Sequence, residues 1–392
     1  MSEREHDVVI VGGGPVGAAL AIALSASDYD VLLLEARPGL GTASDGRTLA
    51  MSYGSRLILA RLGAWKRVEP ATPIHSIHIS QRGGFGRALL TAEDAGLPAL
   101  GYVIGHAKLH RAMGEVLASA QATLAAGASV DDLQFGADHV TIRFRRGDQE
   151  HFVHARLLVI ADGGASLGKR AGASIKVRDY RQEAIVASVA TSLPHGQRAY
   201  ERFTTDGPVA LLPFEDRYAL VWTAAPAAAT RISAMNDKCF LECLQAHFGD
   251  RAGRFLSVAG RARFPLALRY AANPVLPRSV LLGNAAQALH PIAGQGFNLG
   301  LRDAWDLADL IQRRDDRDPG SAACLAAYRS ARRLDRLGGI AVTDSLVRIF
   351  SNDFAPLRAA RGAGLALLDI APPAKRAFMQ RMIFGASFES GF

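Results

Sequence analysis

Near the N-terminus, the residue types and their spacing suit binding of a dinucleotide. The run Gly12-Gly13-Gly14-Pro15-Val16-Gly17 matches the pattern G-x-G-x-x-G, and Glu35 lies 18 residues after Gly17. In this pattern the first glycine permits a tight turn, the second lets a pyrophosphate approach the backbone, and the third allows close packing of helix on strand. The start of the following helix attracts phosphate, and a carboxylate at the position of Glu35 binds ribose hydroxyls.

The elements around this motif are those that must position it. Val8–Val11 predicts a short buried strand, Ala18–Ser27 a buried helix and Val31–Leu34 a second strand that ends at Glu35. The order strand, glycine turn, helix, strand and acid predicts a Rossmann-like unit. The unit suits either NAD or FAD. No second G-x-G-x-x-G follows, so we expect one dinucleotide in a standard site.

Three later segments carry further polar residues. Arg47 lies in a polar loop and is either a phosphate or cofactor contact or a solvated loop arginine. Asp162 follows the buried strand Leu157–Ile160, at the end of a strand where open α/β sheets bind ligands, although an isolated Asp-Gly is more often only a turn. The segment from Gly283 to Asn298 is rich in glycine and polar residues, and we expect its His290 to line a pocket.

The remaining pattern indicates an inserted unit. From about Tyr180 to Phe264 strand-like runs dominate, among them Val209–Leu212 and Tyr218–Trp222, which predicts an inserted sheet. Leu301, Trp305 and Ala308 then share one face of an expected helix.

Composition excludes several classes of protein. The 392 residues are 49% hydrophobic and 21% charged, which is a globular composition, and the formal net charge is +8. Cys239 and Cys243 lie four apart without a second cysteine pair, so we expect buried cysteines and no metal site. We find no nucleic-acid motif. The charged N-terminus and the lack of an apolar run of about 18 residues argue against a secreted or membrane-spanning protein.

Taken in order, the three blocks resemble a known family. The N-terminal glycine motif, the central Asp-Gly and the distal Gly-Asn…Pro-x-x-Gly-Gln-Gly-x-Asn are similar to the single-component flavoprotein aromatic hydroxylases, the para-hydroxybenzoate hydroxylase superfamily. Within it, Leu282–Asp303 resembles the signature of the ubiquinone-biosynthesis hydroxylases. The run Val342–Val347 resembles the UbiH branch, the 2-polyprenyl-6-methoxyphenol hydroxylases.

The resemblance implies a fold and a set of site residues. The fold is α/β: a Rossmann-like FAD-binding domain (1–75, 101–179 and 276–340) with an inserted β-sheet substrate domain (76–100 and 180–275) and C-terminal helices (341–392). The implied FAD-binding residues are Gly12, Gly14, Pro15, Gly17, Glu35, Arg37, Arg47, His106, Asp162, Asn284, Pro291, Gly294, Gln295, Gly296 and Asn298. The implied substrate pocket includes Leu211, Pro213 and His290.

The resemblance also implies an activity. Reduced FAD would react with O2 to a C4a-hydroperoxide that hydroxylates the ring of a polyprenylated phenol in ubiquinone biosynthesis, with no catalytic base named among the residues. The departures at His106 and after Asp162 leave the electron donor open, as NAD(P)H or another reductant. Alternatives are a hydroxylase of a small soluble phenol, a flavin-dependent reductase of prenyl chains and a non-catalytic subunit of a quinone-biosynthesis complex.

The C-terminal segment adds an expectation about partners. Residues 329–392 hold ten Lys and Arg against five Asp and Glu, and Phe378, Met379, Met382 and Ile383 are spaced as on one helix. A basic amphipathic helix binds a membrane surface, a partner protein of a multienzyme complex or its own domain. We expect a cytoplasmic protein with peripheral contact to the inner membrane.

Overall fold

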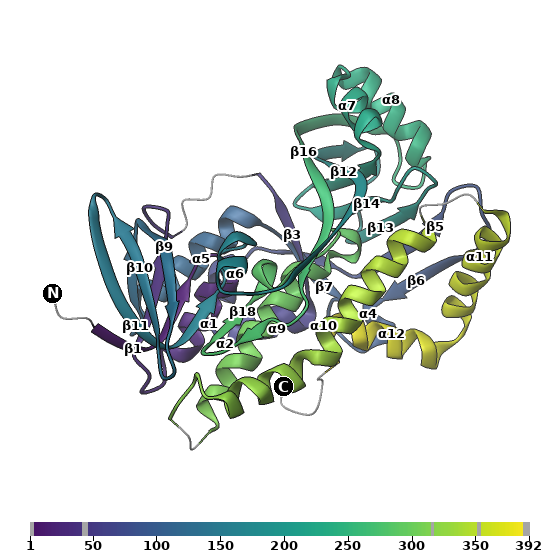
Figure 1. The fold of residues 1–392 in the computed structure, drawn as a ribbon. Helices are drawn as coiled ribbons and strands as arrows, with labels where there is room; N and C mark the ends of the chain where they lie inside the picture. Colours follow the sequence, from purple (N-terminus) through teal and green to yellow (C-terminus); the bar gives the residue numbers. More distant parts are fainter. Residues whose placement is uncertain (1–3, 41–45, 315–316, 351–353, 387–392) are drawn as a thin grey trace.

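The computed structural model describes residues 4–40, 46–314, 317–350 and 354–386 (Figure 1). The described chain forms two large sheets and a small one, with helices between and around them.

The first sheet carries the N-terminal motif. Its parallel strands are ordered β18-β11-β1-β2-β8, and β17 adds an antiparallel edge. Val8, Val9 and Ile10 of β1 are fully buried because both faces of this sheet are covered. The strands are β1 (Arg4–Val11), β2 (Val31–Glu35), β8 (Thr123–Ala126), β9 (Ala128–Phe135), β10 (Val140–Arg146), β11 (Gln149–Ile160), β17 (Val275–Leu276) and β18 (Ser279–Leu281).

Different layers cover the two faces of this sheet. Helices α1 (Pro15–Leu24), α5 (His106–Ala118) and α9 (Gln295–Gln312) share one hydrophobic core with Val8 and Ile10. The antiparallel ribbon β9-β10-β11 and the short helix α6 (Ser166–Arg170) share the opposite core with Val9 and Val11.

The second sheet is the inserted unit. Its order is β19-β16-β12-β15-β14-β13-β5-β6, antiparallel except where β13 pairs with β5. The strands are β5 (Ser76–Gln81), β6 (Arg87–Thr91), β12 (Ile175–Thr191), β13 (Arg198–Phe203), β14 (Val209–Phe214), β15 (Arg217–Ala224), β16 (Phe255–Ala271) and β19 (Gln287–Ala288). The long strands β12 and β16 run from the upper lobe toward the first sheet (Figure 1).

Helices α7 (Pro226–Ala234) and α8 (Asp237–Phe248) cover one face of this second sheet. A three-stranded sheet, β3-β7-β4, contributes to the region between the two large sheets. The remaining short elements are β3 (Thr48–Ser52), α2 (Tyr53–Arg61), α3 (Trp65–Val68), β4 (Thr72–Ile74), α4 (Ala92–Ala95), β7 (Gly101–Gly105), η1 (Gly283–Ala285) and η2 (Ile292–Gly294).

Three helices end the described chain. The long helix α10 (Ala322–Phe350) runs from the first sheet toward the second, and α11 (Ala355–Ile370) and α12 (Pro372–Phe384) lie beside β6 and α4 (Figure 1). Among the described residues, none of the helices combines the length and apolarity needed to span a membrane.

The expected α/β fold with an inserted sheet and C-terminal helices is confirmed. The domain boundaries stay a prediction. The strands of the second sheet extend from Ser76 to Thr91 and from Ile175 to Ala271, with β19 added from the distal segment.

Candidate functional site

The glycine turn after β1 forms a cradle that is open on one side. Gly12 has a φ of 109°, and a Cβ there would lie 2.5 Å from the carbonyl oxygen of Ala161. A Cβ at Gly17 would collide with the carbonyl oxygen of Gly12, so α1 approaches β1 only because glycine occupies this position. A Cβ at Gly14 would have no neighbour within 4 Å. The open side of the cradle is therefore at Gly14.

Helix α1 begins at this open side. Gly14 is its N-cap residue with extended backbone, no side chain caps the helix, and Pro15 occupies the first turn. The N–H groups of a first helical turn lack partners within the helix, and the helix dipole adds positive potential. This end of α1 suits a phosphate group.

Glu35 closes the other side of the turn. Its carboxylate accepts hydrogen bonds from the Gly13 N–H (2.6 Å) and from the Arg37 backbone and guanidinium (2.9 and 2.8 Å). Burial alone would raise the pKa of Glu35, but the hydrogen bonds from Arg37 and Gly13 hold it below its usual range. Glu35 is therefore a carboxylate at neutral pH, oriented by the neighbouring arginine.

Asp162 and Asn284 follow β11 and β18, at the same edge of the sheet as the glycine turn. Asp162 accepts a hydrogen bond from the Gly164 N–H at 3.1 Å, and the Asn284 side chain is exposed. Arg269 of β16 joins the two loops by donating to the carbonyl oxygens of Gly163 (3.1 Å) and Asn284 (3.5 Å).

The loop from Pro291 to Gly294 leads into helix α9, and the space at the start of this helix is also open. Gly294 is the N-cap residue in left-handed conformation, with φ 60°. A Cβ at Gly296 would have no neighbour within 4 Å. Pro291 is exposed before the short helix η2, and Gln295 begins α9. The start of α9 thus offers the same combination of open space and positive helix dipole as the start of α1.

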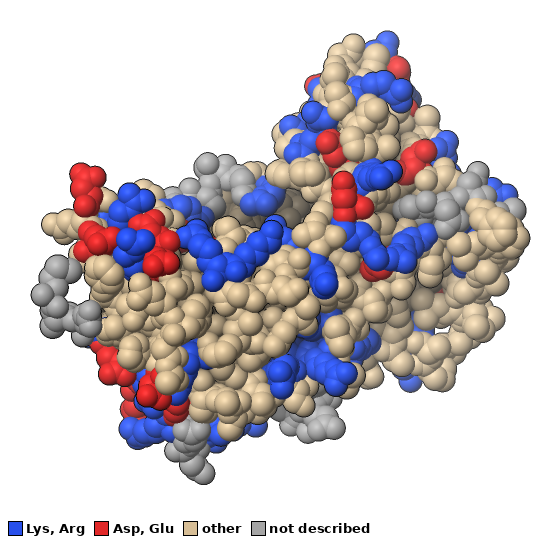
Figure 2. Space-filling view, viewed as in Figure 1, with Lys and Arg blue, Asp and Glu red and all other residues tan. Residues whose placement is uncertain are grey.

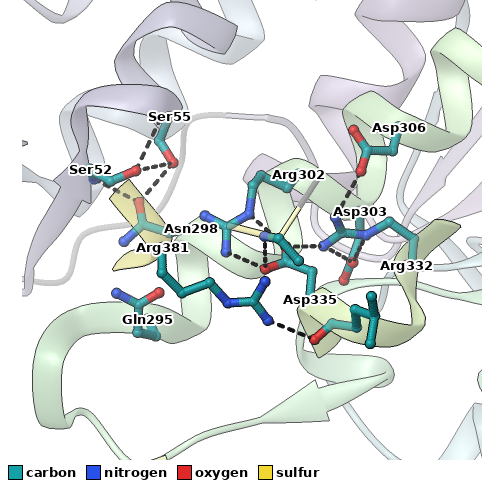
Figure 3. A network of polar contacts seen from close by, with 12 residues as sticks. Ser52, Ser55, Gln295, Asn298, Arg302, Asp303, Asp306, Arg332, Asp335 and Arg381 are labelled. Atoms are coloured by element: carbon teal, nitrogen blue, oxygen red, sulfur yellow. Dashed lines mark hydrogen bonds and ion pairs between the residues drawn. The ribbon is translucent and has the colours of Figure 1, made fainter. Parts of the chain in front are cut away.

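Asn298 fixes this loop in place. Its Oδ1 accepts from the Ser52 N–H (2.8 Å) and the Ser55 hydroxyl (2.7 Å) (Figure 3). Its Nδ2 donates to the carbonyl oxygens of Gly294 (2.7 Å) and Ala50 (3.3 Å). The side chain is buried, and the protein supplies partners for both of its polar atoms. Asn298 holds Gly294 in position, and its expected contact with FAD stays a prediction.

Arg47 and His106 lie side by side along the backbone. The carbonyl oxygen of Arg47 accepts from the His106 N–H at 2.8 Å. The Arg47 side chain is exposed, with its guanidinium 5.8 Å from the centre of the Phe264 ring. The His106 ring meets the His110 ring edge to face at 4.5 Å.

A cavity of about 280 Å³ lies between this loop and the inserted sheet. Pro291, Gly294 and Gln295 line one side of it. Its other walls come from β3, β5, β6, β13, β14, β15 and the three C-terminal helices, and most lining side chains are apolar. A cavity of this kind suits a largely apolar ligand held beside the α9 loop.

Strand β14 faces this cavity with different residues from those expected. Ala210 and Leu212 line it, whereas Leu211 and Pro213 are buried and are absent from its lining. Leu211 packs instead in the core beneath α7 and α8. Successive side chains of a strand point to opposite faces, so an expectation displaced by one residue selects the wrong face.

His290 lies behind the cavity rather than in its lining. Its Nδ1 accepts from the Ile292 N–H at 3.2 Å, and its ring meets Tyr180 edge to face at 5.4 Å. Burial lowers the pKa of His290 to about 4. The residue is therefore neutral at physiological pH and supports the turn into η2.

The C-terminal helices close the cavity. Phe378, Met379, Met382 and Ile383 of α12 line it, and Gln295 Nε2 donates to the Met382 carbonyl oxygen at 3.4 Å. Lys375 pairs with Asp94 of α4 at 3.1 Å. The sequence left a membrane surface, a partner protein or its own domain as the binding partner of this basic amphipathic segment. In the structure, α12 contacts its own domain.

A buried ionic cluster holds α10 against α9 (Figure 3). The guanidinium of Arg332 contacts Asp303 (2.8 Å), Asp306 (2.7 Å) and Asp335 (2.8 Å), and Arg302 contacts Asp335 at 2.8 Å. Burial alone would raise the pKa of Asp335, but Arg302 and Arg332 hold it below its usual range. The cluster keeps the helix that carries the distal loop in register with α10.

Comparison with known proteins identifies the family of this chain. The sequence profile of the FAD binding domain family matches residues 5–335. This chain belongs to the FAD binding domain family. Open space lies at Gly14 in the turn before α1 and at Gly296 at the start of α9.

Several relatives that match nearly the whole chain are hydroxylases of ubiquinone biosynthesis. The ubiquinone hydroxylase UbiL of Rhodospirillum rubrum is 36% identical, covering 97% of this chain and 90% of that protein. The 3-demethoxyubiquinol 3-hydroxylase of Escherichia coli is 33% identical, covering 96% and 98%. The human mitochondrial ubiquinone biosynthesis monooxygenase COQ6 is 29% identical, covering 96% and 92%. The expected resemblance to the ubiquinone-biosynthesis hydroxylases is confirmed.

Solved structures agree on the fold. The p-nitrophenol 4-monooxygenase PnpA of Pseudomonas putida superposes with a TM-score of 0.79 at 19% identity, covering 98% of this chain and 99% of that one. PqsL of P. aeruginosa superposes with a TM-score of 0.72 at 21% identity, covering 92% and 99%.

Sequence reasoning missed several residues of this FAD-binding protein. Arg269 and Glu201 lie far along the chain from the glycine motif, and no local pattern marks them. The spacing of Phe378, Met379, Met382 and Ile383 indicated an amphipathic helix, but not that this helix lines the cavity. The expectation of buried cysteines is wrong for Cys239, which is exposed on α8, while Cys243 is half-buried. Over the described ranges, no group of three His, Cys, Asp or Glu side chains is arranged to hold a metal ion.

Proposed function

We propose that this chain is an FAD-dependent monooxygenase that hydroxylates the aromatic ring of a polyprenylated phenol in ubiquinone biosynthesis. The observation that carries the proposal is the apolar cavity between the α9 loop and the inserted sheet. The near full-length similarity to ubiquinone-biosynthesis hydroxylases supports it.

The proposed cofactor site uses the open space at Gly14 and the open space at Gly296. Gly12, Gly14 and Gly17 would admit the pyrophosphate, the first turn of α1 behind Pro15 would bind it, and Glu35 would face the ribose. The residues fit FAD because the space at Gly14 is open, which lets a pyrophosphate approach the backbone there.

Other residues would bind the rest of FAD. Asn284 offers an exposed amide and Asp162 a carboxylate at the same sheet edge. Gly294, Gln295 and Gly296 at the start of α9 would stabilise negative charge on the flavin ring through the helix dipole. Further contacts are proposed for Arg37, Arg47, His106 and Pro291, while Asn298 acts through Gly294.

When bound, FAD supplies the activation of O2 and the transfer of oxygen to the ring. The chain binds the ring beside the α9 loop, orients it and excludes water with apolar walls. Among the residues that line the cavity in the described ranges there is no lysine, arginine or histidine. That lining disfavours a small phenol that carries a carboxylate, which a buried cation would normally pair.

A membrane-facing helix would deliver a prenylated substrate. Leu365 and Leu368 of α11 line the cavity, while Leu367 and Ile370 of the same helix are exposed. Helix α11 would therefore join the cavity to a lipid surface, with its exposed apolar side chains inserted between headgroups. Figure 2 shows basic side chains along the junction below the upper lobe, where they would favour an anionic surface.

The test uses purified protein loaded with FAD and a phenol that carries a short prenyl chain. We expect oxygen from isotopically labelled O2 in the ring of the product, and faster turnover than with the same phenol lacking the tail. Flavin bleaching without O2 by NADH or NADPH would identify the proposed nicotinamide donor. If the FAD-loaded protein hydroxylates only phenols without a prenyl chain, the substrate assignment is wrong. If the protein binds no FAD, it is not an FAD-dependent monooxygenase.

The pathway is tested in cells. We expect a deletion strain to accumulate a prenylated phenol that lacks one hydroxyl group, and the intact gene to remove it. If a variant without bound FAD restores quinone synthesis equally well, the chain acts as a non-catalytic subunit of a quinone-biosynthesis complex.

A further inference from the structure

The cavity contains one acidic side chain that the proposed binding of ring and tail does not use. Glu201 lies on β13, whose alternation places Ala199, Glu201 and Phe203 toward the cavity. Tyr200 points to the opposite core, where its ring meets Phe248 edge to face at 5.6 Å. Glu201 pairs across the sheet with Ile79 of β5 and Ala210 of β14, and both of these neighbours line the cavity.

In the part of the chain that the structure describes, Glu201 makes no ion pair. Burial, with no compensating charge, raises the pKa of Glu201 to about 8. Its neighbours across the cavity include Pro291 and Gln295 of the α9 loop, so the carboxyl group and the proposed flavin face border the same space.

Most charged and titratable groups on the adjoining elements bind partners outside the cavity, and Arg87 of β6 and Arg376 of α12 are absent from its lining. Asp344 of α10 binds Arg178, Arg348 and Tyr180, and His290 packs on Tyr180. The remaining groups with partners outside the cavity are Asp369, Arg361, Lys375 and Arg381 on α11 and α12, His78 on β5, Arg198 and Arg202 on β13 and Arg217 on β15.

We propose that Glu201 is a catalytic residue that accepts the phenolic proton of the substrate bound in this cavity. The inference rests on the proposed function, since it assigns the base for the same reaction. The O–H bond of the phenol breaks, the proton passes to the Glu201 carboxylate, and the electron pair stays on the phenolate oxygen. No electrons change hands in this step. The phenolate donates its electron pair into the ring and makes the ring carbon that is to be hydroxylated more nucleophilic.

The surroundings of Glu201 suit this role. A phenol has a pKa of about 10, and an ordinary glutamic acid of about 4.3 is a weak base toward it. A carboxylate in an apolar wall without a cation is a stronger base, because burial favours its protonated form. The same burial means that the group must first lose its proton. Activity is therefore expected to rise as pH rises through about 8.

The first test compares the pH dependence of kcat/KM in the FAD-loaded wild type, Glu201→Gln and Glu201→Asp. We expect Glu201→Gln to lower kcat/KM by about 100-fold at pH 9 and to flatten the rise, as expected for loss of a general base. We expect Glu201→Asp to have a higher kcat/KM than Glu201→Gln, and its kcat/KM to increase with pH as in the wild type. Glu215→Gln, at an exposed position in the turn after β14, is the matched control and leaves the profile unchanged. An unaltered rate and profile in Glu201→Gln overturns the proposal.

A second test needs no turnover. 4-Nitrophenol is an acidic phenol that binds largely as its anion in this pH range. Its affinity for the wild type should fall as pH rises through about 8, because two negative charges would then share an apolar cavity. The affinity of Glu201→Gln should stay flat, and identical curves for the two proteins overturn the proposal.

The two tests separate this inference from the proposed function. Hydroxylation by the wild type with equal rates in Glu201→Gln overturns the role of Glu201 alone. Glu201-dependent phenol binding without hydroxylation of any prenylated phenol overturns the proposed function and leaves Glu201 as the proton acceptor of a phenol site.

Discussion

The Ser55 hydroxyl donates a 2.7 Å hydrogen bond to the Asn298 side-chain oxygen, joining residues that are 243 positions apart in the sequence (Figure 3). Ser55 lies in α2, which directly follows strand β3, and Asn298 lies in the first turns of α9. The bond therefore ties the loop that would face the flavin to a rigid neighbouring helix. Loop residues that bind a ligand need such support to keep their geometry.

Replacing Asn298 with alanine should loosen this loop. The Ser52 N–H and Ser55 hydroxyl would lose a buried acceptor, which costs about 1–3 kcal/mol of unfolding free energy. We expect denaturant unfolding to shift by that amount and FAD to dissociate faster. In flavin-free protein, Asn284→Ala, which removes an exposed amide, is the control and should leave the free energy of unfolding unchanged. Equal stability losses in the two variants would contradict the supporting role of Asn298.

Gly14→Ala and Gly17→Ala should separate cofactor binding from folding. A Cβ at Gly14 meets no atom, so the flavin-free protein should lose less than about 1 kcal/mol of stability. FAD affinity should fall at least tenfold, because the methyl group occupies the pyrophosphate approach. A Cβ at Gly17 collides with the Gly12 carbonyl, so that variant should lose about 1–3 kcal/mol without any ligand. Thermal unfolding and a flavin fluorescence titration measure the two effects, and unchanged FAD affinity in Gly14→Ala would refute the assignment of the cradle.

The sequence allowed prediction of the parts that are determined locally. The glycine turn joins β1 to α1 within one βαβ unit, so a linear pattern specifies it, whereas the close approach of Gly12 to Ala161 joins residues 149 positions apart. The face of β14 was harder to assign, because both of its faces are largely apolar and no alternation of polar residues marks the cavity side. The contact of Gln295 with Met382 spans 87 positions, and nothing in either segment specifies the other. Glu201 has an ordinary local sequence, and only its tertiary surroundings make it unusual.

Arg332→Met should destabilise the protein strongly. Arg332 is 2% exposed and contacts three carboxylates, so its removal leaves uncompensated negative charge in the core between α9 and α10. Breaking a buried pair by removing one partner costs about 3–5 kcal/mol. Arg313→Met is the control, since the Arg313 side chain is 76% exposed and its pair with Asp309 contributes about 0.5 kcal/mol or less. Denaturant unfolding of flavin-free protein measures both, and a loss below 1 kcal/mol for Arg332→Met would show that the cluster is not stabilising.

Stability should fall as pH decreases from about 6.5 to 4, in part through His247. Burial, followed by the nearby Arg82, lowers the pKa of His247 to about 4, so the folded protein holds it neutral. The unfolded chain binds a proton below about 6.5, and this uptake favours unfolding increasingly as pH falls, by about 3 kcal/mol at pH 4. His247→Gln should weaken the pH dependence, whereas the exposed His75→Gln should not. Urea unfolding at several pH values measures the slope, and an equal slope in wild type and His247→Gln would exclude this contribution.

The double variant Leu367→Glu and Ile370→Glu should weaken binding to anionic lipid vesicles. Both side chains are exposed on α11, at 62% and 76%, and lie one and two positions from cavity-lining Leu368. Burying a leucine or isoleucine side chain contributes about 1.5–3 kcal/mol, and a new carboxylate repels the anionic surface, so affinity should fall at least tenfold. Leu256→Glu, at a residue 59% exposed on β16 of the upper lobe, is the matched control and should bind vesicles like the wild type. Vesicle co-sedimentation measures binding, and the KM for a prenylated phenol presented in vesicles should rise in the double variant alone. If the double variant binds vesicles as well as the control does, α11 is not the membrane-facing helix and the substrate reaches the cavity by another route.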